Sequence, residues 1–113
     1  MKNKLLFVCS ANMMRSPTAE DLFKGSQKYA TKSAGILPTA TVRVIQDHID
    51  WADRIFVMSE KEDGHLTYLR KNFDILGKNI AVLDIPNIYQ MRGHPELRKI
   101  LQQKLSVLLG ETI

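Results

Sequence analysis

Short apolar runs alternate with helix-like patterns along this chain of 113 residues. The runs at 5–8, 55–58 and 80–83 are each four residues long and are dominated by aliphatic and phenylalanine side chains. Such runs are typical of strands that are buried on both faces of a sheet. The more polar segment 31–36 predicts a fourth strand, at an edge of that sheet.

The first and last predicted helices have recognisable boundaries. Pro17 follows Ser16, which is a suitable N-cap, and a helix is expected over 17–24. From Pro95 onward a leucine stripe at helical spacing predicts a long helix that ends near Gly110. We expect this stripe to lie in the core and not to bind a partner.

Two further helices are predicted between the strands. Apolar residues recur at helical spacing over 42–52, and the sequence SEKE at 59–62 matches a capping box before a third helix that Gly64 would weaken. Strands that alternate with helices predict an α/β fold of three layers, in which a central four-stranded parallel sheet has helices on both faces. The length fits a single domain over 1–113.

Composition and charge narrow the classes of function. Hydrophobic residues make up 44% of the chain, as in folded globular proteins. The net charge of +4 comes from scattered basic residues without interleaved aromatic side chains, so no nucleic-acid partner is expected. The apolar run at 5–8 is too short for a secretion signal or a membrane span, which predicts a cytoplasmic protein without a membrane partner.

The only cysteine, Cys9, lies just after the first predicted strand in the sequence FVCSANMMRSPTAE. It has no second cysteine for a disulfide or a CxxC site. In an α/β sheet, ligands bind beyond the carboxyl ends of the strands. The loop 9–15 and the following helix start therefore predict an anion cradle of backbone N–H groups and the planar fork of Arg15.

Cys9 in that cradle would be stabilised as a nucleophilic thiolate by the loop amides and the nearby guanidinium. The alternative is an inert buried thiol, which the position of Arg15 argues against. The hydroxyl of Ser16 could donate to the sulfur as well as cap the helix. Asn12 is either a brace that accepts a left-handed backbone or an ordinary loop residue.

These residues resemble a known pattern. VCSANMMRSPTAE is similar to the phosphate-binding loop of the low-molecular-weight protein tyrosine phosphatases, which has the form C-x5-R-S followed by proline and an early helix glutamate. The segments SAG at 33–35, WADRIFVMSE at 51–60 and IPNIY at 85–89 follow in the order of that family. The chain resembles a compact prokaryotic branch of it.

The resemblance implies hydrolysis of a phosphorylated protein or a small aryl phosphate, with inorganic phosphate as product. Cys9 would attack phosphorus while Arg15 and the loop amides hold the oxygens, and water would hydrolyse the cysteinyl-phosphate without a metal or cofactor. Tyr89 would line the entrance and stack on the substrate ring, or serve only in packing. The loop residues expected around the phosphate are Ser10, Ala11, Asn12, Met13, Met14 and Ser16.

The proton donor for the leaving group is where the pattern departs from the family. Asn87 stands where relatives carry an aspartate before a proline. Three interpretations stay open: Asp84 donates the proton, His94 does so, or general acid catalysis is lost. Asp84 is the preferred proton donor because strand ends face the site in this architecture. The alternative is that Asp84 is only a turn residue. His94 precedes Pro95, where capping of the last helix accounts for it. The loss of an acid would leave a phosphate- or phosphotyrosine-binding module.

Two methionines in the loop bear on related chemistries. Many relatives carry a second cysteine at the position of Met14, and thioredoxin-coupled arsenate reductases need additional cysteines, so a lone cysteine argues against that reaction. Met13 is large and apolar where arginine phosphatases have threonine, which favours an aromatic phosphoester. His48 and His65 lie in predicted helices without clustered ligands, so no metal site is expected.

Overall fold

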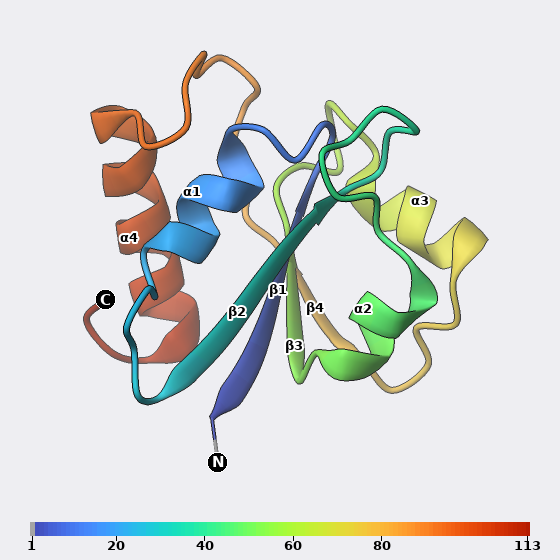
Figure 1. Ribbon diagram of the computed structural model, residues 1–113, viewed down its shortest axis with the longest axis horizontal. Coiled ribbons are helices and arrows are strands. Elements are labelled where there is room, and N and C mark those ends of the chain that lie inside the picture. The colour runs from blue at the N-terminus through green and yellow to red at the C-terminus, as the bar shows by residue number, and fades with distance from the viewer. Residues whose placement is uncertain (1) are drawn as a thin grey trace.

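The computed structural model describes residues 2–113 and contains a four-stranded, wholly parallel sheet in the order β2-β1-β3-β4. The strands are β1 (Asn3–Cys9), β2 (Tyr29–Gly35), β3 (Arg54–Val57) and β4 (Asn79–Val82). The helices between and after them are α1 (Arg15–Asp21), α2 (Gln46–Trp51), α3 (His65–Asn72) and α4 (Pro95–Leu109) (Figure 1). The predicted fold class is confirmed, including the place of the 31–36 segment in an edge strand.

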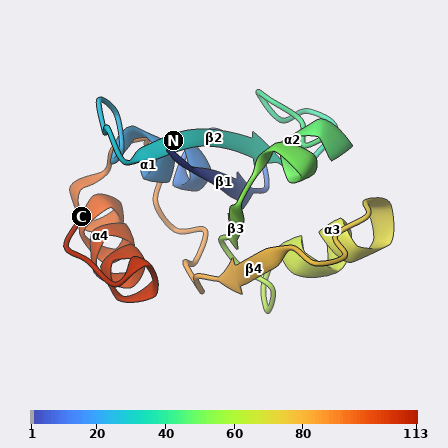
Figure 2. The same ribbon diagram turned by 90° about the horizontal axis from the view of Figure 1, so that it is seen from below.

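Helices cover both faces of the sheet, which explains why β1 is apolar at successive positions. Leu5, Phe7 and Cys9 belong to the core cluster under α1 and α4. Leu6 and Val8 belong to the other core cluster, under α2 and α3. Figure 2 shows α1 and α4 on one side of the sheet and α2 and α3 on the other. Because neighbouring strand residues face opposite sides, the part of a central strand that helices cover on both faces has no solvent-facing position for a polar side chain.

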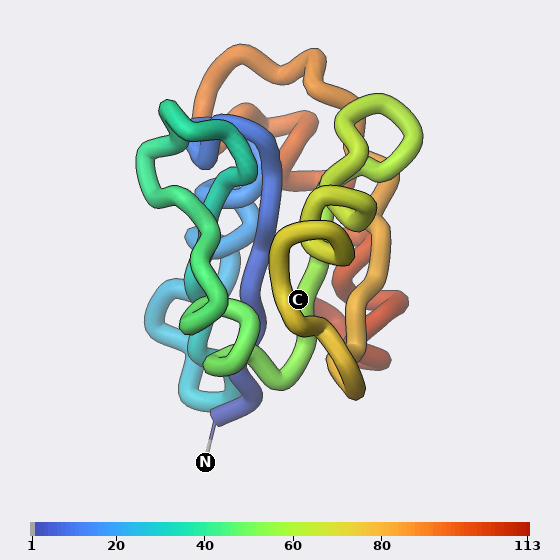
Figure 3. The backbone as a smooth tube through the Cα atoms, turned by 90° about the vertical axis from the view of Figure 1, so that its right-hand side faces the viewer, coloured from blue at the N-terminus to red at the C-terminus, as the bar shows by residue number. Residues whose placement is uncertain are grey.

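The strand order places the end of β1 at the switch point of the sheet. The chain runs from β1 to β2 on one side and reaches β3 on the other side, so the loop after β1 lies between two diverging neighbours. Loops that follow the four strands gather at the same end of the molecule (Figures 1 and 3). This end is where an open α/β sheet binds ligands.

The predicted boundaries of the first helix were wrong. Helix α1 begins at Arg15, and Ser16 is therefore inside the helix and does not cap it. After Asp21 the chain continues in tighter i→i−3 turns, in which the N–H groups of Leu22, Phe23 and Lys24 donate to carbonyls three residues earlier. These turns carry the helical pattern toward Gly25 without extending the α-helix.

Two other predicted helices start later than expected. Residues 42–44 lie beside the end of β2, where Gly35 N–H donates to Val42 O and Val44 N–H donates to Gly35 O, so α2 begins only at Gln46. The capping-box segment 59–62 closes a turn, because Ser59 Oγ accepts from the N–H of Glu62. Helix α3 then begins after Gly64, whose φ of 66° is left-handed. Backbone pairing with distant residues overrode the local pattern in the first case.

The last strand and helix are close to expectation. Strand β4 is an edge strand and is only partly buried, which corrects the prediction of burial on both faces. In α4, Leu97, Leu101 and Leu105 are fully buried in the core, as predicted. His94 caps this helix by accepting the N–H of Glu96 on its Nδ1, at 3.1 Å. Within residues 2–113, no helix combines the length and the apolar character that a membrane crossing requires.

Candidate active site

The loop after β1 surrounds a small cavity that Cys9 helps to line. The cavity has a volume of about 100 Å³, which is room for several water molecules. Met13 and Leu37 lie at its exposed rim, with 59% and 41% of their surfaces accessible. The lining residues are Cys9, Ser10, Ala11, Met13, Met14, Arg15, Leu37 and Asn87. Six of the predicted site residues are thus brought together here.

The backbone of this loop is bonded on one side only. The carbonyls of Cys9, Ser10 and Ala11 accept the N–H groups of Ile36, Leu37 and Thr41. Among the residues that the structure describes, the N–H groups at positions 10–14 have neither backbone nor side-chain acceptors. A run of free amides beside a cavity is the backbone arrangement that binds anions.

Asn12 and Ser16 brace the loop from below. Asn12 has the left-handed φ of 54°, and its amide nitrogen donates to Ser16 Oγ and to Ser33 Oγ, both at 2.9 Å. Its Oδ1 accepts the N–H of Val42 at 3.1 Å, so both the nitrogen and the oxygen of its side-chain amide are hydrogen-bonded. Asn12 therefore makes the contacts of the brace that the sequence suggested.

The hydroxyl of Ser16 contacts the sulfur of Cys9. The two atoms lie 2.9 Å apart, and both side chains are buried. Ser16 Oγ already accepts from Asn12, and its own proton can go either to this sulfur or to Ala34 O at 3.5 Å. The shorter distance favours donation to sulfur, which stabilises a thiolate.

Arg15 is almost fully buried, with 2% of its surface exposed, and is held by one of its terminal nitrogens. Its Nη1 donates to Asp63 Oδ2 and to Ile85 O, each at 2.9 Å. Nη1 carries only two protons, so these two acceptors use it completely. The edge formed by Nε and Nη2 has no acceptor within residues 2–113, and Arg15 is among the residues that line the cavity. Two parallel N–H groups on such an edge fit two oxygens of a phosphate.

Asp63 and His65 form a second layer around the loop. Ser10 Oγ lies 3.3 Å from Asp63 Oδ1 and 3.0 Å from His65 Nε2. The Nδ1 of His65 accepts the N–H of Ser59 at 2.9 Å, which leaves the ring proton of neutral histidine on Nε2. Burial, followed by the positive charge of Arg15, lowers the pKa of His65 to about 4. Burial acts to raise the pKa of Asp63, but the hydrogen bond and charge of Arg15 outweigh it and lower that pKa.

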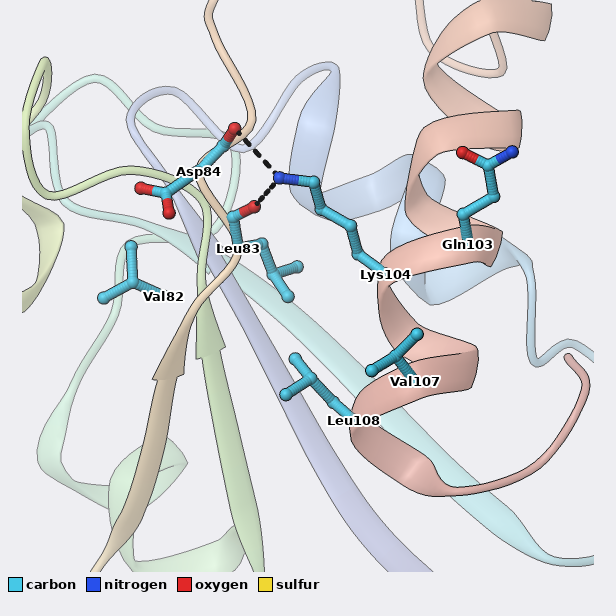
Figure 4. Close-up of a pocket in the computed structure, with 7 residues that line it drawn as sticks. All are labelled: Val82, Leu83, Asp84, Gln103, Lys104, Val107 and Leu108. Atoms are coloured by element: carbon cyan, nitrogen blue, oxygen red, sulfur yellow. Dashed lines mark hydrogen bonds between the residues drawn. The ribbon is translucent and has the colours of Figure 1, made fainter.

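Asp84, the preferred proton donor, lies outside the Cys9 cavity. It is exposed, follows β4 in a left-handed conformation with φ 56°, and lines a hollow between the end of β4 and α4. Lys104 Nζ donates to the carbonyls of Leu83 and Asp84 there, while the carboxylate of Asp84 points away from the ammonium (Figure 4). A catalytic role for Asp84 stays a prediction that would require its carboxylate to move.

Of the residues considered for contact with the leaving group, only Asn87 lies at the Cys9 cavity. Asn87 does line the Cys9 cavity, so the residue that replaces the family aspartate occupies the expected place. Tyr89 is half-buried, and its ring packs against that of His94 with centroids 5.4 Å apart. Neither Tyr89 nor His94 is among the residues that line the cavity.

Asp63 and His65 contact the loop although no motif in the sequence marks them as site residues. His65 was placed inside a predicted helix, yet it is the first residue of α3 and is fully buried. The useful signal was topological: both residues follow β3, and β3 is the direct neighbour of β1. Polar residues after an adjacent parallel strand can be expected near the first loop.

The topology and the Cys9–Arg15 loop together define the fold of the low-molecular-weight protein tyrosine phosphatases. Solved structures of that fold match almost the whole chain. A low-molecular-weight phosphotyrosine phosphatase from Vibrio cholerae is 18% identical, with a TM-score of 0.74 over 96% of this chain and 95% of its own. Vibrio vulnificus Wzb in complex with benzylphosphonate is 21% identical, with a TM-score of 0.76 over 97% and 99%.

A third similar structure is the YwlE arginine phosphatase from Geobacillus stearothermophilus. It is 22% identical, with a TM-score of 0.68 over 96% of this chain and 93% of its own. No protein-family model matches the sequence, and no curated protein is significantly similar to it. The resemblance seen in the sequence is thus confirmed for the fold, and the chemistry has to be argued from the site.

Proposed function

We propose that this protein hydrolyses phosphomonoesters, namely phosphotyrosine in proteins or small aryl phosphates, through a cysteinyl-phosphate intermediate. The observation that carries the proposal is a single cavity bounded by three complementary elements. These are Cys9, the unpaired amides at 10, 11, 13 and 14, and the guanidinium of Arg15, whose Nε and Nη2 are unpaired. A tetrahedral oxyanion on these donors would have its phosphorus in front of the sulfur.

The reaction balances in two steps. The thiolate of Cys9 forms an S–P bond as the P–O bond to the leaving group breaks, and the departing oxygen takes up a proton. Water then attacks phosphorus, the S–P bond breaks, and dihydrogen phosphate and the thiolate are released. The Ser16 hydroxyl at 2.9 Å stabilises the thiolate at both ends of this cycle. No step uses a metal or a cofactor.

The rim of the cavity supports an aromatic substrate. Met13 and Leu37 offer apolar surface at the point where the leaving group would emerge. Apolar side chains at this rim would bury the face of a phenyl ring. Vibrio vulnificus Wzb binds a benzylphosphonate on the same fold, which is an aromatic ring joined to a phosphorus oxyanion. The arginine phosphatase among the similar structures makes phosphoarginine the substrate to compare.

A direct test compares the wild type with Cys9→Ser on an activated aryl phosphate. The proposal expects turnover by the wild type and none by the variant, because a neutral hydroxyl in place of the thiolate is a poor nucleophile. Phosphate binding should persist in the variant, since the amides and Arg15 are unchanged. Equal rates in the two proteins would remove Cys9 from the mechanism.

A second candidate function is a phosphate- or phosphotyrosine-binding module with little turnover. The position of Asn87 favours it, because an amide that cannot transfer a proton lines the cavity while Asp84 lies elsewhere. Lack of a general acid typically costs about a hundredfold to ten-thousandfold with poor leaving groups. Tight phosphate binding without measurable turnover of phenyl phosphate would support this candidate.

Two variants locate the proton donor. Asn87→Asp should raise the rate on phenyl phosphate far more than on an activated aryl phosphate, because only the poorer leaving group needs the proton. Asp84→Asn tests the remaining proposal that Asp84 donates it. A pH–rate profile whose basic limb is the same in wild type and Asp84→Asn would exclude Asp84. The cytoplasmic location stays a prediction.

A further inference from the structure

The segment between β3 and α3 contacts the phosphate loop through a continuous series of hydrogen bonds. Ser59 N–H binds His65 Nδ1, His65 Nε2 lies 3.0 Å from Ser10 Oγ, and Ser10 Oγ lies 3.3 Å from Asp63 Oδ1. The other carboxylate oxygen of Asp63 accepts Nη1 of Arg15 at 2.9 Å. The series therefore joins both ends of the loop, positions 10 and 15, to one neighbouring segment.

Proton counting gives each bond in this series a direction. His65 Nδ1 accepts from a backbone N–H, so a neutral ring carries its proton on Nε2 and donates it to Ser10 Oγ. Ser10 then donates its own proton to the carboxylate of Asp63. His65 cannot accept the proton of Ser10 in this state, so the pair is not a nucleophile with its base. The arrangement fixes geometry and does not transfer protons.

The bond from Asp63 determines which edge of Arg15 is available. One N–H of Nη1 donates to Ile85 O and the other to Asp63. The guanidinium is therefore held by two acceptors, one in the loop after β4 and one in the loop after β3. With only Ile85 O, rotation about that single bond would let Nε and Nη2 leave the cavity. Small displacements of such a group are costly, because a misplacement of about 1 Å can lower a rate about a hundredfold.

We propose that Asp63 and His65 are positioning residues for the reaction, in which Asp63 holds Arg15 with its Nε–Nη2 edge toward the bound oxyanion and His65 holds Ser10 in the loop. The proposal rests on the proposed function of the Cys9 cavity. The residues after β3 thus preorganise the loop, which has its phosphate-binding geometry before phosphate binds.

The carboxylate of Asp63 should also weaken the binding of an anion, and this effect can be tested. Its negative charge lies next to the guanidinium that must attract an anion, so geometry and charge act in opposite directions. Asp63→Asn keeps an oxygen that can accept Nη1 but removes the charge. Asp63→Ala removes both. The two variants therefore separate orientation from electrostatics.

The first experiment measures phosphate binding by calorimetry and aryl phosphate turnover for both Asp63 variants. Asp63→Asn should bind phosphate as tightly as the wild type or more tightly, and Asp63→Ala about tenfold to a hundredfold more weakly, with kcat reduced by about a hundredfold. Asp21→Ala is the matched control, because it removes another arginine–aspartate pair, Asp21 with Arg92, away from the cavity. This control should leave binding and kcat unchanged.

The second experiment uses two replacements of His65 that each imitate one ring nitrogen. Gln places an amide N–H near the position of Nε2 and can still donate to Ser10, whereas Asn places an oxygen near Nδ1 and keeps only the bond from Ser59. His65→Gln should restore kcat to within about threefold of wild type, and His65→Asn should lose about tenfold or more. Histidine nitrogen shifts from NMR should show the Nε2–H form of His65 in the wild type at pH 7.

Several outcomes would overturn the proposal. Equal phosphate affinities for Asp63→Ala and wild type would show that Arg15 needs no second acceptor. Equal losses in His65→Gln and His65→Asn, or a ring protonated on Nδ1, would remove the bond to Ser10 from the argument. A wild type that binds phosphate but does not turn over any aryl phosphate overturns the enzymatic function alone. A wild type that binds no phosphate overturns both.

Discussion

Acidification should weaken the fold through His65 in a pH range where few other groups titrate. In the folded protein its pKa is lowered to about 4, first by burial and then by the charge of Arg15, from an ordinary value of 6.5. Between these two values the unfolded chain binds a proton that the folded protein rejects. Stability is therefore fully present above pH 6.5 and is lost as the pH falls toward 4.

The size of the effect follows from the two values. A difference of one pKa unit is worth about 1.4 kcal/mol, so the total loss approaches about 3 kcal/mol well below pH 4. Most of the change falls within an accessible range, with a loss of about 2 kcal/mol between pH 7 and pH 5. Carboxyl groups with lowered pKa, such as Asp63, contribute mainly at more acidic pH.

Urea unfolding at several pH values between 5 and 7 measures this loss directly. His65→Gln is the test variant, since it removes the titrating ring, and its free energy of unfolding should depend less on pH by about 2 kcal/mol over the range. His48→Gln serves as a comparison: burial and the charge of Lys32 also lower the pKa of His48, but this histidine is partly exposed on α2, so its replacement should change the pH dependence less than His65→Gln does. Parallel pH profiles for the wild type and His65→Gln would refute the assignment of a neutral, buried imidazole.

Three other substitutions test the loop and the core. Gly35→Ala would place a Cβ 2.4 Å from Ser10 O and 2.9 Å from Asn12 N, so calorimetry should show loss of phosphate binding and denaturation a loss of about 2 kcal/mol or more. Asn12→Ala removes three hydrogen bonds at a left-handed position and should lower the free energy of unfolding by about 2–4 kcal/mol. Asn12→Gly should be more stable than Asn12→Ala, because glycine adopts the left-handed backbone without strain. Equal stabilities of these two variants would contradict a contribution from backbone strain. Leu101→Ala, in the buried face of α4, should cost about 2–5 kcal/mol in urea unfolding yet leave phosphate affinity intact.

The parts of the fold that could be predicted are those set by local pattern. The apolar runs at 5–8 and 55–58 fall on the two central strands, β1 and β3, where burial on both faces of the sheet requires successive hydrophobic residues. Helix α4 matched its leucine stripe because one face of it packs on the sheet along its whole length. The loop from Cys9 to Arg15 was recognisable because its residues are contiguous in the chain.

The errors arose where a distant backbone competed with the local pattern. Residues 42–44 have helical spacing of apolar side chains, but their N–H and C=O groups pair with Gly35 and with the amide of Asn12. Buried backbone groups must find partners, and this requirement outweighs the weak preference for one more helical turn. The later start of α3 has a local reason: Gly64 has a left-handed φ of 66° and therefore precedes the helix.

The sequence by itself determined the α/β layers, the central strands and the contiguous loop of Cys9, Asn12 and Arg15. Only the tertiary structure decided what surrounds that loop: Asp63 and His65 reach it across about half of the chain, Asn87 lines its cavity, and Asp84 points elsewhere. The physical reason is that a run of residues encodes its own periodicity and turn chemistry. The partner of a buried charge is chosen by which strands lie side by side, and no spacing along the chain records that choice.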